Sequence, residues 1–101
     1  MSLPEFQDYV ESKKPACFVY STANQTNIHS TLSVMNRYSQ VKVSLNSMRV
    51  MFLGSCGYLC INFVSHVEIS ENDDGSTEWI EFVCAVHGKK TQDRYCIIAE
   101  F

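Results

Sequence analysis

Cysteine and histidine are the side chains whose types and spacing could support metal chemistry in this chain. Cys56 and Cys60 have three residues between them. Cys84 and His87 have two. Structural zinc sites usually hold each ligand pair on a tight turn with about two intervening residues, and Cys84 and His87 fall in a strand-like segment that would direct them to opposite faces. We therefore predict no bound metal and no cofactor; the residues that a metal would use are Cys56, Cys60, Cys84 and His87.

A cysteine nucleophile is the other chemistry that these residues could support. Cys56 lies between Gly54 and Gly57, in a setting that predicts exposure. A catalytic thiol needs a base within hydrogen-bond reach and a lowered pKa, and His66 and His87 are the imidazoles available for that task. No nucleophile elbow or cysteine-hydrolase motif surrounds Cys56. A small thiol-dependent enzyme or metal site around Cys56, His66 and His87 is therefore an alternative to a non-enzymatic function.

Carboxylates are concentrated in the window 68–81, which contains no lysine or arginine. Its centre, Asp73-Asp74-Gly75, is typical of a turn, and the spacing of a calcium-binding EF-hand loop, with its distal glutamate, is absent. Glu78 and Glu81 are expected on opposite faces of one strand, so they do not form a pair for acid–base catalysis. We interpret the window as a solvated acidic loop and its flanking strands.

Basic and aromatic residues suggest a second alternative, a small barrel that binds nucleic acid. Such modules combine a basic groove with aromatic side chains on which bases stack. The residues that could supply both are Arg37, Tyr38, Lys42, Arg49, Arg94 and Tyr95. The net charge of −3 provides no overall basic field, so we do not expect nucleic acid to be a partner.

The composition predicts a small domain with surplus apolar surface. The chain has 101 residues, of which 46% are hydrophobic and 19% are charged. This length predicts one domain over residues 1–101, and the low charged fraction favours self-association. Five cysteines without a secretory leader predict free thiols in the reducing cytoplasm. No apolar run is long enough to span a membrane, so we expect no membrane association.

A short amphipathic helix is predicted at the start of the chain, over about residues 4–13. Ser2 and Glu5 have the spacing of a capping box. Phe6 and Tyr9 lie three residues apart and start an apolar stripe. A helix of this length does not persist alone, so we expect its stripe to pack on the remainder of the domain.

Extended segments are predicted over most of the remaining chain, from about residue 16 to residue 101, because apolar and polar residues alternate with period two. The predicted strands are 16–21, 40–45, 48–53, 58–70, 77–87 and 94–101. The segment 28–38 fits a strand or a helix, and its Thr and Ser content favours a strand. We therefore predict a mainly β α+β fold in which the helix packs on an antiparallel meander of about six or seven strands, as a small barrel or a two-layer sandwich.

The predicted strand 77–87 is apolar on both faces, which requires two layers of cover. One face carries Trp79, Val83 and Ala85. The helix, through Phe6 and Tyr9, or a partner subunit could cover it. These five residues are therefore the predicted interface. We expect a non-enzymatic intracellular binding or assembly module whose partner is a second copy of the chain or another protein.

Overall fold

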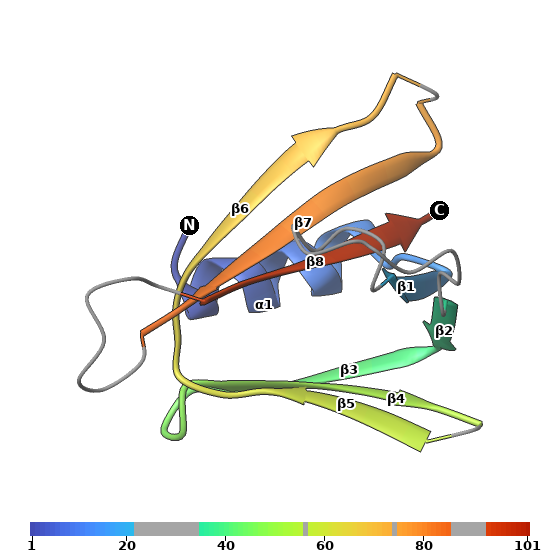
Figure 1. Ribbon diagram of the computed structural model, residues 1–101. Coiled ribbons are helices and arrows are strands. Elements are labelled where there is room, and N and C mark those ends of the chain that lie inside the picture. The colour runs from blue at the N-terminus through green and yellow to red at the C-terminus, as the bar shows by residue number, and fades with distance from the viewer. Residues whose placement is uncertain (22–34, 56, 74, 86–92) are drawn as a thin grey trace.

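The computed structural model describes residues 1–21, 35–55, 57–73, 75–85 and 93–101 (Figure 1). These residues form one helix and eight strands, which confirms the mainly β class and slightly exceeds the predicted number of strands. The elements are α1 (Leu3–Lys13), β1 (Cys17–Ser21), β2 (Met35–Tyr38), β3 (Gln40–Ser44), β4 (Arg49–Gly54), β5 (Gly57–Ile61), β6 (Val64–Glu71), β7 (Thr77–Cys84) and β8 (Asp93–Glu100). Part of the ambiguous segment 28–38 is strand β2, and its residues 28–34 lie outside the described residues.

The helix α1 has the predicted capping box. The Glu5 N–H donates to Ser2 Oγ at 3.3 Å, and the Ser2 N–H donates to Glu5 Oε1 at 3.1 Å. This hydrogen bond from the Ser2 backbone lowers the pKa of Glu5. At the other end Lys14 takes a left-handed conformation, with φ at 49°, and its N–H donates to Val10 O at 3.0 Å. Within the described residues no helix is long and apolar enough to cross a membrane.

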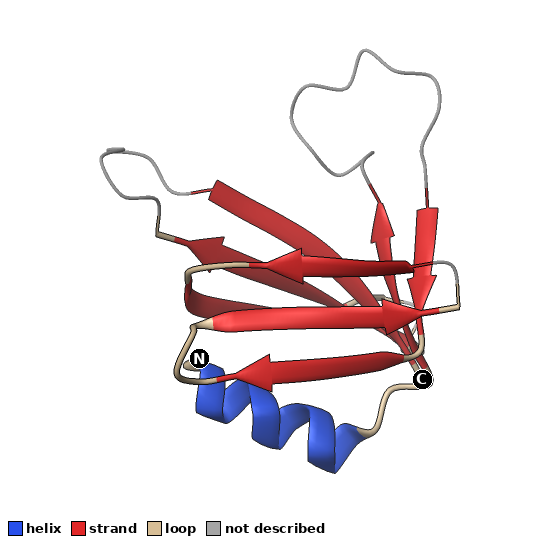
Figure 2. Cartoon of the chain, turned by 90° about the horizontal axis from the view of Figure 1, so that it is seen from below, coloured by secondary structure: helices blue, strands red, loops and turns tan. Residues whose placement is uncertain are grey.

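The strands form two antiparallel sheets that face each other without closing into a barrel, and α1 runs along one edge of the smaller sheet (Figure 2). The large sheet has the order β2-β1-β8-β7-β6, and the small sheet has the order β3-β4-β5. Adjacent hairpins build β3-β4-β5 and β6-β7-β8, as the meander predicted. The pairing of β1 with β8 was not predicted, because it joins strands from opposite ends of the chain.

The predicted strand 58–70 is wrong in one respect: it is two strands in two sheets. β5 ends at Ile61 in the small sheet, and β6 begins at Val64 in the large sheet. Between them Phe63 has a left-handed φ of 59° and a 61% exposed side chain, although the alternation placed it on the buried face. The chain must turn a corner to change sheets, and period two holds only while a strand stays in one ladder.

A second irregularity restores the predicted alternation after this corner. The corner brings Val64 to the buried face, and a register shift between Val64 and His66 then leaves Ser65 outside the ladder. The Ser65 hydroxyl donates to Val83 O at 3.1 Å on the neighbouring strand. Because the two irregularities compensate, Val67 is fully buried, as its position in the alternation predicted.

A second corner joins β2 to β3 at Ser39. The Ser39 N–H donates to Leu53 O at 2.9 Å. The chain therefore begins to pair with β4 directly after the last residue of β2, which pairs with β1. Gly54 at the end of β4 lies against this corner, and a Cβ atom there would be 2.6 Å from Arg37 O. A glycine is therefore required at this close contact between β4 and β2.

The core lies between the sheets and contains a row of packed aromatic rings. Phe6 of α1 contacts Phe82 of the large sheet edge-on, with ring centroids 5.2 Å apart. Phe82 contacts Phe52 of the small sheet at 5.8 Å, and Phe52 contacts Phe18 at 5.2 Å. The helix therefore packs on the core face of the large sheet and does not cover the opposite face of β7, which carries Trp79 and Val83.

Candidate functional site

The outer face of the large sheet carries a short apolar row across its middle strands. Val19, Ile98 and Trp79 are register neighbours on β1, β8 and β7. Val19 is 2% exposed, whereas Ile98 and Trp79 are half-buried. Val83, also on this face of β7, is 3% exposed. Most of the apolar area on this face is therefore already removed from water in the single chain.

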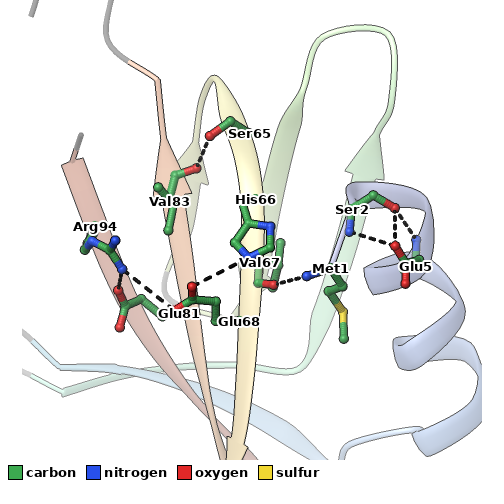
Figure 3. A network of polar contacts seen from close by, with 10 residues as sticks. All are labelled: Met1, Ser2, Glu5, Ser65, His66, Val67, Glu68, Glu81, Val83 and Arg94. Atoms are coloured by element: carbon green, nitrogen blue, oxygen red, sulfur yellow. Dashed lines mark hydrogen bonds and ion pairs between the residues drawn. The ribbon is translucent and has the colours of Figure 1, made fainter. Parts of the chain in front are cut away.

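Charged side chains on this face are paired with one another (Figure 3). Arg94 bonds Glu81 and lies 3.8 Å from Glu68, and His66 Nε2 lies 3.6 Å from Glu68 Oε1. The hydrogen bond with Glu81 raises the pKa of Arg94. The side chains of Arg94, His66 and Glu68 are about half exposed and that of Glu81 is 24% exposed, so solvent screens these pairs and each contributes little to stability. Arg94, Glu68 and Glu81 therefore each have an oppositely charged partner on this face.

The predicted interface residues are distributed over both faces of the large sheet. Trp79 and Val83 lie together on the outer face, and Ala85 is exposed just beyond the end of β7. Phe6 has no exposed surface and Tyr9 is half-buried, and both pack toward the core. The interface at these residues stays a prediction, and the little surface of Phe6 and Val83 limits what they can contribute to it.

The predicted metal and thiol residues are not brought together by the described part of the chain. Cys56 and His87 lie outside the described residues. Cys60 is on the outer face of the small sheet, whereas Cys84 is buried on the core face of the large sheet. Burial raises the pKa of Cys84 to about 11. Among the described residues, no group of three metal-ligating side chains is close enough to hold an ion.

The other described thiols also lack the features of a nucleophile. Burial, with the nearby Glu100, raises the pKa of Cys17, and burial with Glu81 raises that of Cys96. A thiol with a raised pKa stays protonated near neutral pH and reacts slowly. His66, the described candidate base, contacts Glu68 on the outer face of the large sheet rather than a thiol.

Basic residues proposed for nucleic acid are divided between two faces. Arg37 is on the outer face of the large sheet, 2.5 Å from Glu100. Lys42 and Arg49 are on the outer face of the small sheet. Tyr38 is 7% exposed and packs in the core, so it presents no ring for stacking. The described residues therefore do not assemble the predicted basic groove with aromatic platforms.

A hollow of about 240 Å³ lies where the end of α1, the β6–β7 turn and the end of β8 meet. Its lining residues are Lys13, Glu71, Gly75, Thr77, Glu78 and Phe101. Glu78 is 8% exposed and is the buried charged residue of the described chain. The Tyr9 hydroxyl donates to Glu78 Oε1, and burial together with Glu78 raises the pKa of Tyr9.

Hydrogen bonds hold the turn that forms one wall of this hollow. The Asn72 side-chain amide donates to Thr77 Oγ1 at 2.8 Å, and the Gly75 N–H donates to Asn72 O at 3.2 Å. The Phe101 N–H donates to Ser76 O at 3.1 Å, which ties the end of the described chain to the same turn. No motif in the sequence predicts this hollow. The one signal is that Glu78 lies on the same face of its strand as Ile80 and Phe82, which makes it a buried position.

The small sheet has the more exposed apolar surface. Among the described residues, the exposed large apolar side chains are Leu45, Met48, Tyr58, Phe63 and Phe101, and all but Phe101 lie on this sheet or at its ends. Tyr58 is 69% exposed on the outer face, beside half-buried Leu53. Sequence reasoning missed this surface because it treated 58–70 as one strand with one buried face.

The edges of the two sheets are protected to different degrees. At β6, the Val67 N–H donates to Met1 O at 2.9 Å and the Met1 amino group donates to Val67 O at 2.5 Å (Figure 3). β3 lies beside α1, and the two line a hollow of about 380 Å³. No described residue pairs with the second edge of β5, whose residues Gly57–Ile61 include no charge and no proline. Edge strands of natural proteins usually carry a charged residue or a proline, or are covered by another element, and this prevents pairing with a second chain.

Comparison of the chain with protein-family models, with curated proteins and with solved structures gave no match.

Proposed function

We propose that this chain is a non-enzymatic binding and assembly module that self-associates through the edge of β5. The observation that carries the proposal is the unprotected edge of β5, where Tyr58 is 69% exposed and no described residue completes the hydrogen bonding. A free edge with unpaired N–H and C=O groups is a template for another strand. The thiol-dependent alternative has less support, because burial raises the pKa of Cys17, Cys84 and Cys96 and the described candidate base His66 contacts Glu68 rather than a thiol.

A second copy is the partner that fits this edge best. An antiparallel pairing centred on Leu59 is self-complementary, since Tyr58 of one copy faces Cys60 of the other and no charges oppose each other. It joins the three strands of each small sheet into one continuous sheet. On the outer face each Tyr58 ring then covers apolar surface of the other copy, which adds hydrophobic stabilisation to the backbone hydrogen bonds.

The other sheet edges are less suited than β5 to pairing with a second copy. On the β6 edge Val67 is hydrogen-bonded to Met1 and the strand carries Glu68 and Glu71. β3 lies beside α1 and carries Lys42, and β2 carries Arg37. Lysine and arginine on an edge oppose pairing with an identical strand because like charges meet across a two-fold axis.

Sedimentation equilibrium at micromolar concentration, with reductant present, tests the proposal. We expect a reversible dimer for the natural chain and a monomer for Tyr58→Lys, because the substitution places two positive charges across the strand pair. Leu45→Lys is the matched control: it adds the same charge at an exposed turn of the same sheet, and the dimer should persist. A natural chain that stays monomeric over this concentration range would disprove the proposal.

A further inference from the structure

We propose that the hollow beside Glu78 is a binding site for a small organic cation, a primary ammonium group on an alkyl chain. This site is separate from the β5 edge, at the meeting point of α1, the β6–β7 turn and the end of β8. Three features of the described residues carry the proposal: an incompletely satisfied buried carboxylate, a second carboxylate directly opposite it, and an apolar wall beside them.

Glu78 is the first feature. The residue is buried, with 8% exposure, and it lines the hollow. Oε1 accepts a hydrogen bond from the Tyr9 hydroxyl, whereas no described residue donates to Oε2. A buried carboxylate is costly unless an opposite charge or several donors compensate it. One neutral hydroxyl leaves the second oxygen available to a ligand in the hollow.

Glu71 is the second feature. It is the register partner of Glu78 across β6 and β7, so the two carboxylates project from the same face. Like charges directly opposite each other in a sheet destabilise it. None of the ion pairs between described residues includes Glu71, Glu78 or Lys13. A cation held between Glu71 and Glu78 would remove this repulsion. It would also donate a hydrogen bond to Oε2 of Glu78.

The shape of the hollow selects an organic cation rather than a metal ion. Phe101 lines it with a ring that is 48% exposed, which suits an alkyl chain and can contact an ammonium group through its face. The volume of about 240 Å³ accommodates a ligand of a few heavy atoms. Calcium needs six or more oxygen ligands at close range, and the described residues contain no cluster of metal-ligating side chains.

Lys13 lines the same hollow without an ion pair to either carboxylate. Its ammonium group competes with an incoming cation for the same negative field. Replacing Lys13 with glutamine should therefore strengthen binding of a cationic ligand. If Lys13 were instead the permanent counter-ion of Glu78, this replacement would only destabilise the fold.

Calorimetric titration of the full chain with 1,4-diaminobutane tests the proposal. We expect saturable binding that 1,4-butanediol, a neutral analogue of similar shape, does not reproduce. Glu78→Gln should weaken binding about tenfold or more, since a hydrogen-bonded charge is lost. Glu68→Gln, on the outer face of β6, is the matched control and should bind as the natural chain does. Thermal melts of each variant establish that it is folded.

A second variant keeps the test decisive if Glu78→Gln does not fold. Glu71 is exposed, so Glu71→Gln should fold normally and still weaken diamine binding by removing one of the two charges. Titration with Nα-acetyl-lysine amide then distinguishes the sources of the ammonium group. Tighter binding of this compound than of the diamine assigns the site to a lysine side chain, and the reverse assigns it to a free amine.

Three results would overturn the proposal. The first is the absence of binding for both ammonium compounds. The second is equal binding of the diol, which would show a hollow without charge selection. The third is calcium binding as tight as diamine binding with the same dependence on Glu78, which would make the site a metal site. None of these results depends on whether the chain dimerises through β5.

Discussion

The outer faces of the large and small sheets differ in how their side chains and edges are satisfied. On the large sheet, Arg94 and Arg37 are paired with carboxylates and the edge strand β6 is bonded to Met1. On the small sheet, Tyr58 is exposed and the second edge of β5 is unpaired among the described residues. The outer face around Trp79 is apolar in sequence, but most of its apolar side chains are already buried within the chain. The surface around Tyr58 is exposed and can contact a partner.

We expect both sheets to unfold as one cooperative unit, and substitutions in the aromatic row of the core test this expectation. Phe52→Ala in the small sheet and Phe82→Ala in the large sheet should each cost about 3–5 kcal/mol in the free energy of unfolding, because each leaves a large cavity. Chemical denaturation monitored by tryptophan fluorescence and by circular dichroism measures both. A much smaller cost for Phe52→Ala would indicate that the small sheet is only loosely attached.

The corner between the sheets provides the next largest expected effect. Gly54→Ala places a methyl group within contact of Arg37 O, and overpacking against backbone costs about 1–3 kcal/mol. The free energy of unfolding from urea titration measures the cost. Gly57→Ala serves as a space control, because nothing lies within 4 Å of its added Cβ, although its positive φ of 142° adds backbone strain. A free energy of unfolding for Gly54→Ala equal to that of the natural chain would contradict a steric role for Gly54.

β7 carries one carboxylate on each face, Glu78 toward the core and Glu81 on the outer face. Removing the hydrogen-bond partner of each compares the two faces. Tyr9→Phe removes the only described donor to buried Glu78 and should cost about 1–2 kcal/mol at neutral pH. In the folded chain the pKa of Tyr9 is raised above its ordinary value of 10.0. The contact therefore contributes fully below this value, and its contribution falls as pH rises above it, because the unfolded chain ionises first.

Urea titrations at several alkaline pH values measure this dependence. The stability of the natural chain should fall more steeply above pH 10 than that of Tyr9→Phe, with Tyr38 and Tyr95 contributing equally to both. Parallel profiles for the two proteins would mean that the contact between Tyr9 and Glu78 does not form in solution.

The exposed ion pairs of the large sheet should have the smallest effect. Arg94→Met removes the contacts with Glu81 and Glu68 and should lower the free energy of unfolding only slightly, because solvent screens these groups. The measurement is the urea midpoint at low and high salt, where the small difference should shrink further. A loss comparable to that of Tyr9→Phe would remove the distinction between the two faces of β7.

Much of the local structure could be predicted from residue patterns. The capping box of Ser2 and Glu5 and the hairpins from β3 to β5 and from β6 to β8 depend on neighbouring residues, so short-range rules suffice. The candidate site was less predictable. Glu78 and Tyr9 are far apart in sequence, and the free edge of β5 exists only because the chain changes sheets after Ile61.

Local residue spacing is enough to predict the mainly β class, the N-terminal helix and the alternation that buries Ile80 and Phe82, since each follows from the removal of apolar side chains from water. The tertiary structure alone decided the β1–β8 pairing, the corner at Phe63 and the face on which α1 packs. These features depend on contacts between distant segments, where several arrangements satisfy the same local pattern and only the packing of the whole core selects one.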